Sequence, residues 1–222
     1  MKSFCSTCLR PTNHKVLKEE IINYQEDETT WWDDTKYQII QCMGCDTISF
    51  RQLYNDASMQ QHYDQDTTTQ ELYPKRGIHS RQIKAYRNVP VDIKKVYLET
   101  VEAYNNNLTL LSGVGVRAVL EGICIDKGIK EGTFKNSLGK EIKSKALDGK
   151  IIGLATNGYL TSDNAEVLHE LRFLGNAAVH ELSNPSIEDL SIAIDIIELV
   201  LDNIYELKHK AKRLTRKRTG VD

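Results

Sequence analysis

Two pairs of cysteines constrain the fold of this chain more than any other sequence feature. Each pair has the spacing C-x-x-C, with Cys5 and Cys8 near the start and Cys42 and Cys45 after 33 intervening residues. Each pair can form a turn that points two thiolates at one ion, and four thiolates satisfy the tetrahedral preference of zinc without leaving an open position. The spacing therefore predicts a structural Zn²⁺ site, with iron or redox-active thiols as the alternatives.

The residues around the cysteines are predicted to form short strands. Segments rich in β-branched and aromatic residues lie at 15–24, 36–41 and 47–53, between and after the two cysteine turns. We therefore expect a small β zinc ribbon over residues 1–54. Residues 55–90 are polar and show no sustained apolar period, which predicts a linker.

After Pro90 the apolar residues recur with a helical period. Helices are predicted over 91–105, 108–127, 136–147, 162–182 and from 186 to beyond 205. The last of these begins at Ser186, which is followed by Asp189 in a capping-box pattern. The expected fold class is α+β, with the small β zinc ribbon followed by an all-α bundle over 91–210 and a basic tail over 211–222.

The cysteine usage suits a reducing compartment. Four of the five cysteines lie in close pairs, and Cys124 lies between two isoleucines, where a small buried hydrophobic residue is expected. No window approaches the roughly 20 consecutive apolar residues of a membrane helix, and the first residues lack the apolar stretch of a signal peptide. We therefore expect a cytoplasmic protein without a membrane partner.

Charge is distributed unevenly although the net charge is only -2. Residues 208–218 carry seven Lys or Arg in eleven positions, whereas residues 25–34 are acidic and include Trp31 and Trp32. The basic segment is a candidate for contact with the phosphates of RNA or DNA. A solvated helix end, where cations suit the helix dipole, is the alternative. The tryptophans are expected to cap the ribbon core or to contact a protein partner.

Polar residues recur on one face of the helix predicted over 162–182. Arg172, Asn176 and His180 follow each other at intervals of four residues, and Arg117 and Glu121 have the same spacing on an earlier helix. A bundle can bring these two faces together as a buried polar network. The network is interpreted either as a structural lock between two helices or as a functional site.

Three segments together resemble the domain-of-unknown-function family numbered 4145. They are R-x-x-L-E-x-I-C at 117–124, L-R-x-L-G-N-A-A-x-H at 171–180 and S-x-E-D-L at 186–190. The resemblance covers about residues 90–207 and extends more weakly to the cysteine pairs and to the Y-P and V-P dipeptides at 73–74 and 89–90. It implies a helical domain similar to the HEPN superfamily, which includes metal-independent ribonucleases of phage defence and toxin systems as well as inactive binding members.

The resemblance also implies candidate catalytic residues and a homodimer. Active HEPN ribonucleases place an arginine, a polar residue, three variable residues and a histidine on one helix. Asn176 and His180 match the polar residue and the histidine, whereas Gly175 occupies the place of the arginine. The candidates are His180 as acid or base, Asn176 beside it, Arg172 or Arg117 on the phosphate, and Glu121 as a partner of the imidazole or of Arg117.

Two functions are therefore expected as alternatives. One is a HEPN-type endoribonuclease that acts without an added metal. The other is a non-catalytic module that binds nucleic acid or a protein and dimerises. Motifs for nucleotide hydrolysis, dinucleotide binding, zinc proteolysis and serine hydrolysis do not occur in the sequence.

Overall fold

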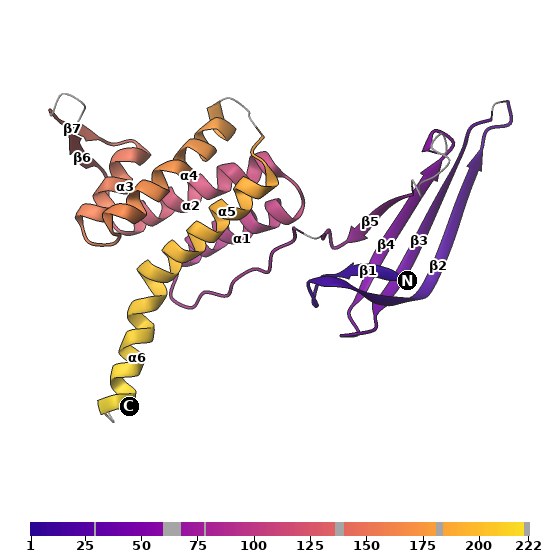
Figure 1. Cartoon of the computed structure of the whole chain (residues 1–222), viewed down its shortest axis with the longest axis horizontal. Coiled ribbons are helices and arrows are strands. Elements are labelled where there is room, and N and C mark those ends of the chain that lie inside the picture. The colour runs from indigo at the N-terminus through magenta and orange to yellow at the C-terminus, as the bar shows by residue number, and fades with distance from the viewer. Residues whose placement is uncertain (29, 60–67, 78, 136–139, 181–183, 220–222) are drawn as a thin grey trace. The chain divides into compact units, whose positions relative to one another are not determined.

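A computed structural model gives the fold of the chain (Figure 1). It describes residues 1–222 except 29, 60–67, 78, 136–139, 181–183 and 220–222, and it leaves the side chains of 135, 173, 177–180 and 216–219 undescribed. The chain divides into two compact units, Met1–Ser80 and Arg81–Asp222. Among the described helices, none is both long and apolar enough to span a lipid bilayer.

The first unit is a curled antiparallel sheet of five strands in the order β1-β2-β3-β4-β5 (Figure 1). The strands are β1 (Lys2–Cys5), β2 (Arg10–Gln25), β3 (Trp32–Cys42), β4 (Ile48–Asp56) and β5 (Thr69–Tyr73). Tyr37, Phe50 and Tyr73 lie side by side on three neighbouring strands, with ring centroids 5.9 and 6.0 Å apart. Ile40 and Leu72 are buried.

The predicted fold class is wrong in its first half, because this sheet is much larger than a small zinc ribbon. β2 and β3 pair along almost their whole length, from His14 opposite Cys42 to Gln25 opposite Trp32. β5, which pairs with β4 from Tyr54 to Phe50, comes from the segment expected as a linker. The pairing of β2 with β3 and of β3 with β4 continues well beyond the cysteine turns, to Gln25, Trp32 and Asp56.

The second unit contains six α-helices, one π-helix and a hairpin among its described residues (Figure 1). They are α1 (Val91–Asn105), α2 (Thr109–Asp126), β6 (Gly132–Lys135), β7 (Glu141–Ser144), α3 (Leu147–Thr156), α4 (Ser162–His180), α5 (Ile187–Leu201), η2 (Asp202–Glu206) and α6 (Leu207–Thr219). Large side chains from five of these helices are fully buried, among them Tyr97, Leu120, Ile151, Leu168 and Ile194. The Ser186 side chain accepts a hydrogen bond of 3.0 Å from the Asp189 amide, so the predicted cap is confirmed.

The prediction of an all-α second half is also wrong, because β6 and β7 form a hairpin in place of part of the helix expected over 136–147. Glycines let this hairpin pack closely on α3. A Cβ atom at Gly132 would lie 1.9 Å from the Gly149 carbonyl oxygen, and one at Gly153 would lie 2.7 Å from the Glu131 carbonyl oxygen. Backbone contact this close requires glycine on the facing surfaces.

Candidate metal centre and nucleic-acid interface

The four paired cysteines meet at one end of the sheet. Cys5 ends β1 and Cys8 follows in the next turn, while Cys42 ends β3 and Cys45 precedes β4. Their sulfur atoms all lie within 4.8 Å of one another, with Cys5 Sγ 3.5 Å from Cys45 Sγ and Cys8 Sγ 3.9 Å from Cys42 Sγ. The cysteines form no disulfide. Sulfur atoms bound to one zinc ion in a tetrahedron are roughly 3.8 Å apart, so the cluster has the size of a metal site.

The two turns have matching backbone conformations. Leu9 and Asp46, each directly after the second cysteine of a pair, have φ angles of 53° and 58°. This left-handed backbone conformation is uncommon for residues other than glycine. It turns the chain sharply after each pair of cysteines. The predicted convergence of Cys5, Cys8, Cys42 and Cys45 is thus confirmed, and the identity of the ion stays a prediction.

Hydrogen bonds support thiolates in this cluster. The Thr12 hydroxyl lies 3.2 Å from Cys42 Sγ and the Gly44 amide donates to the same sulfur at 3.4 Å, and together they lower the pKa of Cys42 to about 6. The Thr47 hydroxyl, 3.1 Å from Cys45 Sγ, lowers the pKa of Cys45. A hydrogen bond with Cys45, with burial as the next cause, raises the pKa of Cys8 to about 12. A cation is needed to hold all four groups as thiolates.

The polar residues predicted on two helices lie at the contact between α2 and α4. A Cβ atom at Gly175 would lie 2.7 Å from the Arg117 Cβ, so the two helices touch at the position where active HEPN ribonucleases would have an arginine. Arg117 Nη2 is 3.8 Å from Glu121 Oε1, and Lys150 of α3 donates to Glu121 at 2.6 Å. Glu121 is therefore held between two cations of its own unit.

The other members of the predicted set lie on α4. Asn176 is half-buried, and its Oδ1 atom has no hydrogen-bond partner in the described part of the chain; the same holds for Nη1 of Arg117. Burial would raise the pKa of Asp148, but hydrogen bonds from Ser144 and Gly149 and the charge of Arg172 hold it below its usual value. The side chain of His180 lies outside the described residues, so its predicted role is not placed.

Sequence reasoning missed Asp148, Lys150 and His169 as members of this polar cluster. Burial, and then the charge of Arg172, lowers the pKa of His169. Lys150 was missed because the preceding helix was expected to end at residue 147, whereas α3 begins there. No local pattern links a lysine to a glutamate 29 positions earlier.

A basic pocket of about 460 Å³ lies between the chain segment before α1 and the C-terminal helices. Its lining is Lys84, Ala85, Arg87, Asn88, Asp202, Glu206, His209, Lys210, Lys212 and Arg213. Both carboxylates already have partners. Asp202 pairs with Lys84 and more weakly with Lys210 at 3.5 Å, while Glu206 accepts hydrogen bonds from the amides of Arg87 and Asn88 and from the Asn88 side chain.

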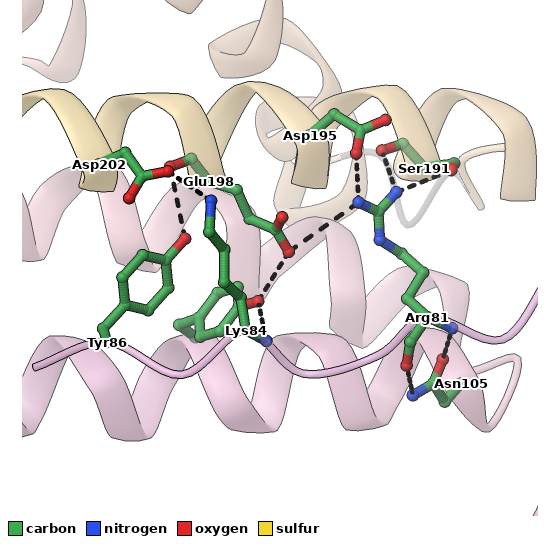
Figure 2. A network of polar contacts seen from close by, with 9 residues as sticks. Arg81, Lys84, Tyr86, Asn105, Ser191, Asp195, Glu198 and Asp202 are labelled. Atoms are coloured by element: carbon green, nitrogen blue, oxygen red, sulfur yellow. Dashed lines mark hydrogen bonds and ion pairs between the residues drawn. The ribbon is translucent and has the colours of Figure 1, made fainter. Parts of the chain in front are cut away.

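The segment that carries Lys84 and Arg87 is anchored to α5 by a polar network (Figure 2). Arg81 donates to the Ser191 carbonyl and hydroxyl groups at 2.9 Å and pairs with Asp195, and Asn105 exchanges two hydrogen bonds with its backbone. Burial would lower the pKa of Arg81, but Asp195 raises it overall. The anchored backbone fixes one wall of the pocket beside α6.

Sequence reasoning found half of this pocket. The cations of α6 belong to the basic segment 208–218, which was a candidate for phosphate contact with a solvated helix end as the alternative. Lys84 and Arg87 were missed because they lie in the segment expected as a linker. Their approach to α6 depends on contacts between residues more than 110 positions apart, such as Lys84 with Asp202.

Comparison with known proteins bears on the helical unit. Residues 98–217 of the 222 match a protein family described as Domain of unknown function (DUF4145). No curated protein and no solved structure matches the chain. The matched range contains the α2–α4 contact and the C-terminal half of the basic pocket, so the family resemblance inferred from residues 117–190 is confirmed. Likeness to the HEPN superfamily stays a prediction.

Proposed function

The chain belongs to the DUF4145 family, and from the geometry of its helical unit we propose that it is a non-catalytic nucleic-acid-binding protein. The basic pocket would hold phosphates of RNA or DNA, and the sheet with its metal site would form a separate folded unit.

This proposal is based on the excess of unpaired cations in the basic pocket. Arg87, Lys212 and Arg213 form no ion pair with a carboxylate in the described part of the chain. Cations that have no protein partner and converge from two chain segments are suited to neutralise phosphate oxygens. Glu206 does not compete with a phosphate for these cations, because its carboxylate is turned to three N–H donors.

We assign zinc to the four cysteines. Four thiolate donors at tetrahedral spacing favour Zn²⁺ over magnesium, calcium or manganese, which prefer oxygen ligands. With all four positions taken by sulfur, the ion would hold β1, β3 and their turns together and would leave no position for a substrate.

A HEPN-type ribonuclease is the second candidate, and the buried polar atoms of Arg117 and Asn176 favour it. Polar atoms without a partner in a buried position are rare and are found at functional sites. The close contact of Gly175 with Arg117 speaks against it, since an arginine side chain at position 175 would collide with α2. Glu121 is moreover engaged by Lys150.

Fluorescence anisotropy tests the first proposal with labelled single-stranded RNA, duplex RNA and duplex DNA over a salt series. Binding should weaken steeply with salt, and Arg87→Glu/Arg213→Glu should weaken it at least about tenfold and reduce the dependence on salt concentration. Lys94→Glu/Lys95→Glu on α1 changes the net charge equally outside the pocket and should have a much smaller effect. Equal losses of affinity in both variants would show that binding depends on the net charge of the protein and not on the basic pocket.

The same RNAs, incubated without an added divalent metal, test the second candidate. We expect them to remain intact. Cleavage that is lost in a folded His180→Ala variant would establish the ribonuclease and replace the non-catalytic proposal.

A further inference from the structure

α6 leaves an apolar stripe exposed on its surface. Leu207, Ala211 and Leu214 follow each other at intervals of four and three residues and therefore share one side of the helix. Leu207 is 49% exposed and Leu214 is 70% exposed. α6 packs against η2 at its start and projects beyond the other helices of its unit (Figure 1). Within the described residues, no other element covers this apolar side, which an amphipathic helix normally buries.

A groove of about 570 Å³ lies between α1 and α2 of the same unit. Its lining is mainly apolar and includes Leu108 and Leu111, which are 49% and 56% exposed. Glu99 and Glu102 lie along it, and neither forms an ion pair with the described cations. The groove is thus an apolar channel with a negatively charged wall, the form of surface that accepts an amphipathic basic helix.

We propose that α6 of one copy docks into the α1–α2 groove of a second copy. The apolar stripe would fill the groove, and Lys208 and Lys210, which flank the stripe on either side, would approach Glu99 and Glu102. α6 contains no acidic residue, so pairing of α6 with α6 of another copy would place cations against cations. Charge therefore selects the groove and not a second α6 as the partner surface.

This contact goes beyond the proposed nucleic-acid binding and shares only Lys210 with the basic pocket. At about 100° per residue, His209, Lys212 and Arg213 lie on the side of α6 opposite the apolar stripe. These residues line the basic pocket. One side of α6 would then face a phosphate while the other faces a second copy of the chain.

Light scattering after size-exclusion chromatography, together with sedimentation equilibrium, tests the contact on the full chain without nucleic acid. The wild type should be a dimer or higher assembly. Leu214→Glu and Leu111→Glu should each raise the dissociation constant at least about tenfold, because a charge would enter the apolar contact. Ile192→Glu, at an exposed position on α5, should assemble as the wild type does. Circular dichroism and thermal unfolding verify that each variant is folded.

A charge exchange tests the identity of the two surfaces. Glu99→Lys/Glu102→Lys and Lys208→Glu/Lys210→Glu should each be mostly monomeric, because the groove and α6 then carry like charges. An equimolar mixture should form a mixed assembly, since every groove again meets an α6 of opposite charge. Asp202 keeps Lys84 as its partner in the α6 variant. A monomeric wild type, assembly unaffected by Leu111→Glu or Leu214→Glu, or a mixture that stays monomeric would overturn the proposal.

Discussion

Replacement of Gly175 by alanine tests the close contact of α2 and α4. The added Cβ would lie 2.7 Å from the Arg117 Cβ and 3.3 Å from the Gly113 carbonyl oxygen. Neither atom is the free end of a flexible side chain, so the helices must separate. Overpacking of this kind costs about 1–3 kcal/mol, while alanine gains about 1 kcal/mol over glycine inside a helix. We expect Gly175→Ala to lower the free energy of unfolding by about 0–2 kcal/mol.

Gly122→Ala is the matched control for this substitution. Gly122 also lies inside a helix, but a Cβ there would meet only Ile93 Cγ1 at 3.4 Å, an ordinary van der Waals distance. Gly122→Ala should gain nearly all of the helix propensity of alanine over glycine. Its free energy of unfolding should therefore be about 1 kcal/mol higher than that of the wild type. Urea titration followed by circular dichroism measures both values. Equal stabilisation by Gly175→Ala and Gly122→Ala would show that the contact of α2 with α4 at Gly175 is not tight.

Three further predictions concern single contacts. Cys42→Ser should reduce the zinc bound per chain, measured by atomic emission spectroscopy, whereas Cys124→Ala in the helical core should leave it unchanged; equal zinc in both variants would exclude Cys42 as a ligand. Burial would raise the pKa of Glu206, but hydrogen bonds from Asn88 and Arg87 lower it overall. The contribution of Glu206 to the stability of the fold is therefore present above the unfolded pKa of about 4.3 and is lost as pH falls through the lower folded pKa. Glu206→Gln should lower the free energy of unfolding by on the order of 1–2 kcal/mol near pH 7, and it should reduce the loss of stability on acidification. Ser186→Ala removes the cap of α5 and should cost about 1 kcal/mol by urea titration, and no change would show that the bond to Asp189 contributes nothing.

The local features of this chain could be predicted from sequence. The spacing of Cys5, Cys8, Cys42 and Cys45 indicated a common site, because each pair needs only a short turn to aim two sulfur atoms at one point. The cap at Ser186 and the first helix over 91–105 depend on residues only a few positions apart and were found for the same reason.

Features that depend on distant contacts could not be predicted. The fifth strand of the sheet was missed because β5 has few apolar residues and is held in place by its pairing with β4. The β6–β7 hairpin was missed because its strands have only four residues each, too few to show a strand period, and because part of it lies in the segment expected as a helix over 136–147. Lys84 and Arg87 show no periodic pattern in the sequence. They are placed by contacts that span more than 110 residues, since Lys84 pairs with Asp202 and the Arg87 amide donates to Glu206.

Ultraviolet cross-linking of the full chain to labelled RNA and DNA, with mass spectrometry of the linked peptides, would locate the nucleic acid on the protein. We expect cross-links in the peptides that contain Arg87 and Arg213, and their loss at high salt concentration. Cross-links confined to residues 1–80, or an even distribution over the surface, would contradict phosphate binding in the basic pocket.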